Sequence, residues 1–140
     1  MQLQPYIFFD GRCEEAIEFY KKALGAEVLM LLRNKESPEP HQPGMLPPGS
    51  ENKVLHATIK VGDSTFSASD GHNAGKPVFQ GCALSLTLND VPTSQKAFKA
   101  LGEGGNVQVP LTKTFFSPSF GMVNDRFGVL WMIYVAQNMA

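Results

Sequence analysis

The sequence is poor in cysteine. Its 140 residues contain only two, Cys13 and Cys82, which lie far apart and form no Cys-x-x-Cys pair. A disulfide framework or a thiolate zinc site needs more cysteines at closer spacing. We therefore expect a reduced, cytoplasmic protein in which both cysteines are small buried hydrophobic residues. Cys13 has an alternative role as a reactive thiol, because it lies near a predicted helix start, where a thiolate is favoured.

An excess of one charge is also missing. The chain has 12 Lys+Arg and 13 Asp+Glu, for a net charge of −1, and no basic run, which argues against a nucleic-acid partner. Its apolar runs are a few residues long, whereas a membrane-spanning helix needs about 20. The first five residues lack the pattern of a signal peptide. We expect one domain, 1–140, with no membrane or nucleic-acid contact.

Hydrophobic periodicity predicts two similar halves. The first half contains a strand at 5–9, a helix at 13–24 and strands at 27–32, 54–61 and 65–69. The second contains a strand at 83–88, a helix that Asp90 caps and Gly102 ends, and strands at 107–111, 120–123 and 129–135. The same four residues, Lys-Ala-Leu-Gly, end both helices, at 22–25 and 99–102. This order predicts an α+β protein built from two βαβββ modules, 1–75 and 76–140.

Each module alone leaves one face of a curved sheet uncovered. We therefore expect the two mixed sheets to pair and to enclose a core or a cavity. The pairing within one chain or between the subunits of a homodimer stays open.

The segment 33–53 holds five of the ten prolines. Proline fixes φ and lacks a donor, which excludes a helix or a central strand here. A loop of this length is uncommon in a compact domain and suggests a lid over a binding site; a surface insertion is the alternative. His41 lies in this loop and His72 in the next, and both are expected to be solvated.

His56 is the strongest candidate for a binding residue. Strand alternation predicts that Leu55, Ala57 and Ile59 face the helix, so that His56, Thr58 and Lys60 face the other side. A histidine beside a threonine suits anchoring of a polar ligand, and a structural histidine in the core is the alternative. In the second half, Ser85 and Thr87 form the polar face of the strand at 83–88. We expect His56, Thr58 and Ser85 to supply polar contacts to a ligand.

Two late features have structural and functional interpretations. Asp125-Arg126 is expected to form the turn between the last two strands, with contact to a substrate as the alternative. Aromatic residues also gather late in the chain, where they fill the core or a dimer interface, or else line an apolar cavity. These residues are Phe115, Phe116, Phe120, Phe127 and Trp131.

The helix sequence EAIEFY at 15–20 and the turn DRFG at 125–128 are two distinctive segments. They resemble the vicinal oxygen chelate superfamily, which includes glyoxalase I, extradiol dioxygenases and bleomycin-binding proteins. The PYIFF strand at 5–9, VLHA at 54–57 and the segment 120–131 are similar to its PhnB-like branch. Sequences of this branch are often labelled 3-demethylubiquinone 3-methyltransferase domains. The chain has no glycine-rich loop after its first strand to hold a methyl donor, so methyl transfer is not expected.

The resemblance implies four positions for the ligands of a divalent metal. They correspond to Gln4, His56, Ala83 and Met132 in this sequence. Only His56 clearly supplies a ligand, since an amide binds metals weakly, alanine has no donor, and a thioether suits neither Mg, Mn nor Zn. Catalytic zinc usually has three protein ligands. The resemblance therefore implies a degenerate metal centre.

Three hypotheses follow. The first is a small-molecule-binding protein, a cytoplasmic homodimer with a mostly apolar pocket and no cofactor. The alternative is a metal-dependent lyase, isomerase or dioxygenase-type enzyme that uses His56 and a divalent ion as a Lewis acid. The third is an interaction protein whose own side chains fill the cavity.

Overall fold

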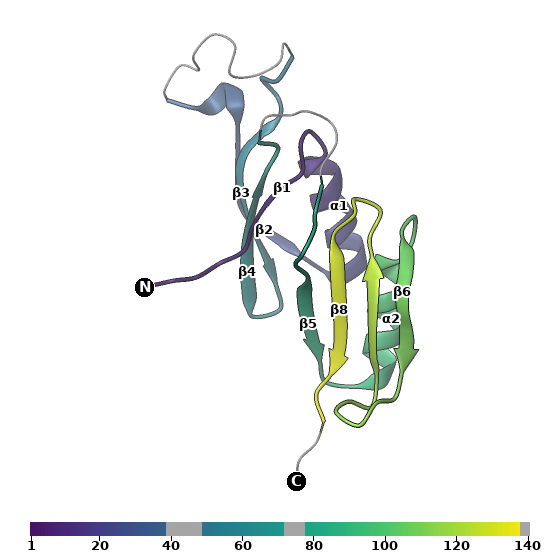
Figure 1. Ribbon diagram of the computed structural model, residues 1–140. Coiled ribbons are helices and arrows are strands. Elements are labelled where there is room, and N and C mark those ends of the chain that lie inside the picture. The colour runs from purple at the N-terminus through teal and green to yellow at the C-terminus, as the bar shows by residue number, and fades with distance from the viewer. Residues whose placement is uncertain (39–48, 72–77, 138–140) are drawn as a thin grey trace. The chain divides into compact units, whose positions relative to one another are not determined.

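Two units of the same design make up the chain, at Met1–Pro77 and Val78–Ala140. The computed structural model describes residues 1–38, 49–71 and 78–137 (Figure 1). Within these residues, each unit contains one α-helix and one four-stranded mixed sheet in the order strand, helix, three strands. The predicted α+β class and the repeated βαβββ order are confirmed.

The first unit contains β1 (Tyr6–Phe8), α1 (Cys13–Leu24), β2 (Glu27–Arg33), β3 (Val54–Val61) and β4 (Ser64–Ser69). Its sheet has the order β1-β4-β3-β2. The β3–β4 hairpin turns through Gly62-Asp63, where Gly62 takes a positive φ. The first strand, β1, runs parallel to β4 at the edge of the sheet.

The second unit contains β5 (Leu84–Leu88), α2 (Val91–Leu101), β6 (Asn106–Thr112), β7 (Phe120–Asn124) and β8 (Leu130–Val135). The sheet order β5-β8-β7-β6 repeats that of the first unit, including the parallel pair of first and last strands. The repeated order indicates a duplicated module, in agreement with the Lys-Ala-Leu-Gly sequence that ends both helices.

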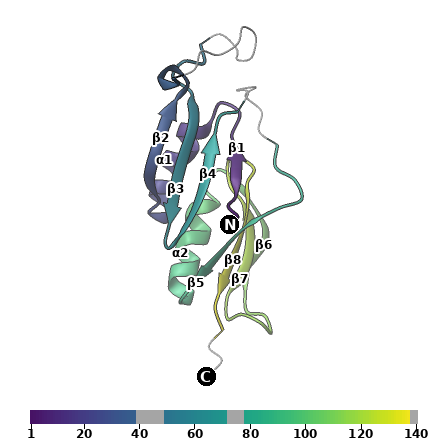
Figure 2. The ribbon, with the colours of Figure 1, turned by 90° about the vertical axis from the view of Figure 1, so that its left-hand side faces the viewer.

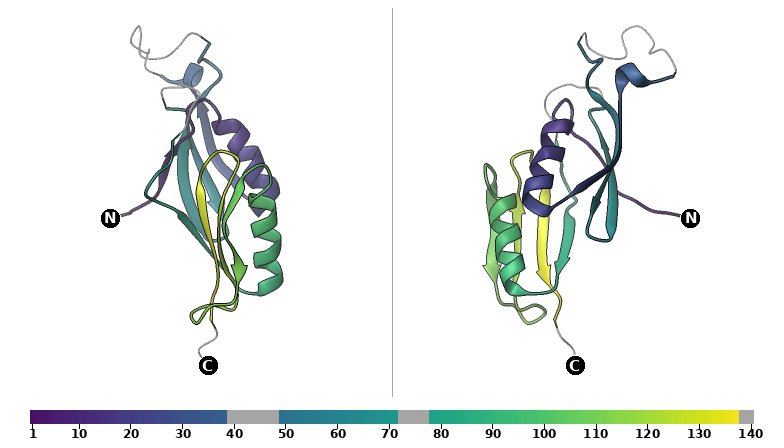
Figure 3. Two further views of the ribbon diagram at one scale, coloured as in Figure 1. Left: turned by 45° about the vertical axis from the view of Figure 1, so that its right-hand side comes forward. Right: turned by 180° about the vertical axis from the view of Figure 1, so that it is seen from behind.

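Each helix packs one row of buried side chains against the sheet of its own unit. Ala16, Ile17 and Tyr20 of α1 are buried, and α1 lies against one face of β2 and β3 (Figure 2). In the second unit Ala97 and Leu101 are buried, and α2 lies along one face of its sheet (Figure 3). Each sheet therefore has a covered face and a face turned away from its helix. Among the described residues, no helix has the length and apolarity to cross a lipid bilayer.

The two helices begin differently. Asp90 caps α2 as predicted, since its Oδ1 accepts a hydrogen bond from the Thr93 amide at 2.8 Å, and the hydrogen bonds from Thr93 lower the pKa of Asp90. Helix α1 has no side-chain cap of its own. Instead Asp70, at the end of β4, accepts a hydrogen bond from the Cys13 amide at 2.8 Å.

The predicted loop 33–53 begins with regular secondary structure, which its proline content did not predict. Arg33 belongs to β2, and Asn34–Glu36 forms a short 3₁₀ helix. This turn precedes Pro38, so none of the prolines constrains it. His41 and the segment 39–48, in which a lid was expected, lie outside the described residues.

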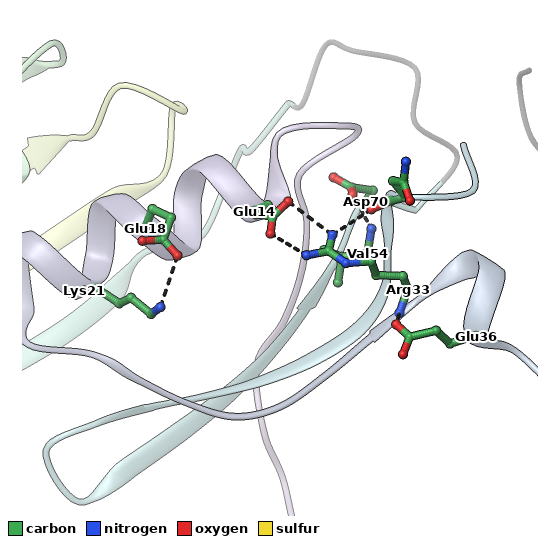
Figure 4. Close-up of polar contacts among 8 residues, drawn as sticks. Glu14, Glu18, Lys21, Arg33, Glu36, Val54 and Asp70 are labelled. Carbon is green, nitrogen blue, oxygen red and sulfur yellow. Dashed lines mark hydrogen bonds and ion pairs between the residues drawn. The ribbon is translucent and has the colours of Figure 1, made fainter. Parts of the chain in front are cut away.

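The described base of this loop is tied to α1 (Figure 4). Arg33 donates two hydrogen bonds to the Glu14 carboxylate, at 3.1 and 2.6 Å, and a third to the Asn52 carbonyl at 2.8 Å. The hydrogen bonds from Arg33 lower the pKa of Glu14. The Asn34 side chain donates to the Ser50 carbonyl at 2.8 Å. These contacts fix both ends of the loop beside the first turn of α1.

Candidate functional site

The face of the first sheet turned away from α1 carries the candidate site. Ala57 and Ile59 of β3 are fully buried, and α1 contacts this strand. Strand alternation then places His56 and Thr58 on the opposite face. The predicted orientation of these two residues is confirmed, whereas their binding role stays a prediction.

His56 has an aromatic partner on this face. The Tyr6 hydroxyl oxygen lies 3.1 Å from Nδ1 of His56, and the two ring centroids are 5.5 Å apart. The Phe8 ring lies 5.0 Å from that of Tyr6. Tyr6 and Phe8 are 43% and 55% exposed, although both carry large aromatic rings. Three rings from β1 and β3 thus form a partly exposed cluster.

The strand register places polar groups beside these rings. Thr58 pairs with Ser67 on one side and Met30 on the other, and Ser67 pairs with Tyr6. The Gln4 amide donates a hydrogen bond to the Thr65 hydroxyl. The face therefore offers hydroxyl and imidazole groups next to aromatic and thioether surface, as expected of a site for a partly polar organic molecule.

Ser85 lies on the second sheet and is exposed. It pairs with Met132, which pairs in turn with Met122. Trp131 and Ile133 alternate with Met132 and are buried, so the Ser85 row belongs to the face turned away from α2. His56 and Thr58 share one sheet face, and Ser85 occupies the corresponding face of the other unit.

The side chains at the metal positions do not form a suitable donor set. Ala83 and Met132 offer neither nitrogen nor oxygen, and the Gln4 amide is engaged with Thr65. His56 is the remaining donor, and its Nδ1 lies within hydrogen-bond distance of Tyr6. Nowhere in the described ranges do three His, Cys, Asp or Glu side chains come together. Two soft or absent donors do not fit a hard divalent ion. His72 lies outside the described residues.

The two cysteines differ from each other. Cys13 is fully buried, as predicted, but Cys82 is exposed, so the prediction of burial was wrong for Cys82. Burial, with the negative charges of Asp70 and Glu14, raises the pKa of the Cys13 thiol. The alternative of a reactive Cys13 thiolate is therefore contradicted, because burial outweighs the effect of the helix start.

Alkylation should distinguish these thiols. Iodoacetamide is expected to label Cys82 in the native protein and Cys13 only after urea unfolding, because the reaction needs an accessible thiolate. Mass spectrometry of peptides measures each label. In the matched variant Cys82→Ser, the native protein should take up no label. Native labelling of Cys13 at the rate of Cys82 would contradict its burial.

Asp125 is a structural residue of the last turn, as expected. Its Oδ1 accepts hydrogen bonds from the amides of Phe127 and Val129, at 2.9 and 3.0 Å, and its Oδ2 accepts one from the Trp131 indole at 2.9 Å. The Arg126 Nε donates to the Glu103 carbonyl at 3.2 Å. Both side chains thus hold the second unit together.

The late aromatic residues separate into three groups. Phe127 and Trp131 are buried in the core, whereas Phe115 is 93% exposed. Phe116 stacks on Tyr134 with ring centroids 6.1 Å apart, and contacts Phe120 at 5.1 Å. Tyr134 and Phe120 are paired on the face turned away from α2. Only part of the predicted cluster is therefore core.

Tyr6 and Asp70 are important residues that the sequence patterns above did not identify. Tyr6 could have been found, because alternation along the strand at 5–9 separates Tyr6 and Phe8 from Ile7 and Phe9. Asp70 could not, since it follows β4 and no local pattern links it to α1. Its hydrogen bonds with the amides of Gly11, Cys13 and Val54 depend on tertiary structure.

Known proteins of similar sequence and structure support this fold. A model of the Glyoxalase/Bleomycin resistance protein/Dioxygenase superfamily matches residues 2–133. The chain is 33% identical over 142 aligned positions to Protein YjdN of Escherichia coli (strain K12), covering 98% of this chain and 97% of that protein. Protein PA1353 from Pseudomonas aeruginosa is 39% identical, with a TM-score of 0.84 and 99% coverage of both chains. A PhnB protein from Bacillus cereus, described as a putative 3-demethylubiquinone-9 3-methyltransferase, is 26% identical, with a TM-score of 0.77, covering 97% of this chain and 100% of that one.

Proposed function

Since the chain belongs to the glyoxalase/bleomycin resistance protein/dioxygenase superfamily, we propose that it is a PhnB-like protein that binds a small organic molecule without a resident metal. His56 and Thr58 contact the polar part of the molecule, and Ser85 contributes from the second sheet. In this proposal the protein is a homodimer in the cytoplasm.

One observation carries this proposal. Tyr6, Phe8 and His56 leave apolar ring surface exposed to solvent beside hydrogen-bonding groups. Exposed aromatic surface is costly in water, and it is retained where a ligand or partner covers it. The poor donor set at the four metal positions favours direct binding over chelation.

Methyl transfer finds no support in the described residues. Strand β1 is followed by Phe9, Asp10, Gly11 and Arg12 and then directly by α1. The single glycine here does not provide the glycine-rich loop that a nucleotide-like methyl donor uses. The activity named for the Bacillus cereus protein is therefore not proposed for this chain.

Metal content and the response to added metal ions test the proposal. Tag-free protein purified without chelators should contain far less than one equivalent of Zn, Ni, Mn or Fe, and added ions should leave the melting temperature unchanged, because a ligand that binds only the folded state raises it. Elemental mass spectrometry and thermal denaturation measure these quantities. One equivalent of metal would contradict the proposal and favour the metal-dependent enzyme.

Replacement of His56 tests the site itself. His56→Ala should remain folded, since His56 is only half-buried, and should bind a co-purifying small molecule at least about tenfold more weakly, as when a charge-assisted or well-placed hydrogen bond is lost. Mass spectrometry of the extracted ligand measures the loss. Lys22→Ala, on the exposed surface of α1, is the matched control. Equal ligand content in both variants would remove His56 from the site.

A further inference from the structure

The contact between Tyr6 and His56 determines which ring nitrogen His56 presents to a ligand. The two side chains come from β1 and β3, with β4 between them. The Tyr6 oxygen lies 3.1 Å from Nδ1, which leaves Nε2 as the nitrogen for an incoming molecule. A neutral imidazole has one donor nitrogen and one acceptor nitrogen, and the bond made by one fixes the role of the other.

The chemistry of the two rings decides the direction of this hydrogen bond. A phenol hydroxyl is more acidic than the N–H of a neutral imidazole, and the bare imidazole nitrogen is more basic than a phenol oxygen. The hydroxyl of Tyr6 therefore donates and Nδ1 of His56 accepts. The proton of the neutral ring then resides on Nε2.

We propose that Tyr6 is a positioning residue that holds His56 as an Nε2–H donor, so that the atom bound at His56 is an acceptor oxygen of a carboxylate or carbonyl group. The choice of ligand atom rests on the proposed small-molecule binding, whereas the tautomer does not. A metal ion at Nε2 would need the opposite tautomer, with the proton on Nδ1. The tautomer and the incomplete donor set thus both favour direct contact between His56 and a ligand oxygen over coordination of a metal ion.

Nitrogen NMR of the free protein tests the tautomer. With ¹⁵N-labelled protein above the titration range of histidine, His56 should show a protonated Nε2 and a bare Nδ1. Tyr6→Phe should lower the ratio of the two tautomers about five- to tenfold, as expected when an ordinary hydrogen bond is lost. Because the Tyr6 side chain is exposed, Tyr6→Phe should remain folded, and its melting temperature checks this.

Tyr134→Phe is the matched control. It also removes a phenol hydroxyl, whose contact is the Phe116 carbonyl at 3.4 Å in the second unit, and it should leave the His56 signals unchanged. A proton on Nδ1 in the wild-type protein would overturn the proposal. An unchanged tautomer ratio in Tyr6→Phe would also overturn it, because Tyr6 would then not set the state of His56.

Two aromatic probes of similar size test the identity of the ligand atom that His56 contacts. Benzoate offers only acceptor oxygens, and benzylammonium offers only donors. Benzoate should shift the Nε2 signal of His56, and benzylammonium should leave it unchanged. A larger response to benzylammonium, or none to benzoate, would overturn the assignment of an acceptor ligand. The proposed function has its own test in the co-purified ligand, so the two failures are distinguishable.

Discussion

Asp70→Asn is expected to destabilise the first unit by about 2–4 kcal/mol, a large part of the total stability of about 5–15 kcal/mol of a small protein. Asp70 is 1% exposed. Its Oδ1 accepts hydrogen bonds from the amides of Gly11 and Cys13, at 2.9 and 2.8 Å, and its Oδ2 accepts one from the Val54 amide at 2.7 Å. Figure 4 shows the contact with Val54.

The asparagine has the same shape but replaces one acceptor oxygen by an NH₂ group. That group would face a backbone N–H, so at least one buried donor would lose its partner. Urea denaturation followed by circular dichroism measures the free energy of unfolding. Asp63→Asn, in the exposed β3–β4 turn, is the matched control and should change it by less than about 0.5 kcal/mol. An Asp70 variant as stable as this control would show that the three hydrogen bonds contribute little.

Asp125→Asn should have a comparable effect on the second unit, about 2–4 kcal/mol. The carboxylate joins two amides of the turn to the indole of Trp131, and it is buried. An NH₂ group cannot accept from either kind of N–H. The turn between β7 and β8 and the packing of Trp131 should weaken together.

Trp131 is the single tryptophan of the chain, so its fluorescence in urea reports on this substitution. The emission of Asp125→Asn should also differ before unfolding, since the indole N–H loses its acceptor. Asp90→Asn in the same unit is the control, because asparagine caps a helix as well as aspartate does. Wild-type stability and emission in Asp125→Asn would contradict the structural role of this residue.

Local sequence patterns predicted most of the fold. The bounds of α1 coincide with the predicted range 13–24, because acidic residues begin it, basic residues follow and Gly25 ends it with φ 69°. The repeated strand order followed from period-2 alternation and turn residues. The resemblance carried by 15–20 and 125–128 led to the superfamily that the comparisons confirm.

Long-range contacts were not predictable in the same way. Alternation placed His56 on the correct face, but its contact with Tyr6 depends on β4 lying between β1 and β3. The cap of α1 comes from Asp70, which is 57 residues from Cys13 in the sequence. Cys82 precedes β5, and its exposure depends on which other parts of the chain pack against it, which no local pattern shows.

The order of strands in each sheet has a consequence for synthesis of the protein. Tyr6 of β1 pairs with Ser67 of β4, and Leu84 of β5 pairs with Trp131 of β8. The first strand of each unit to be synthesised therefore gains its partner only after the last strand of that unit has been synthesised. On the ribosome, β1 leaves the exit tunnel long before β4, and its aromatic residues stay unpaired during that interval. Closure of each sheet is then a late, long-range step, and such steps slow folding.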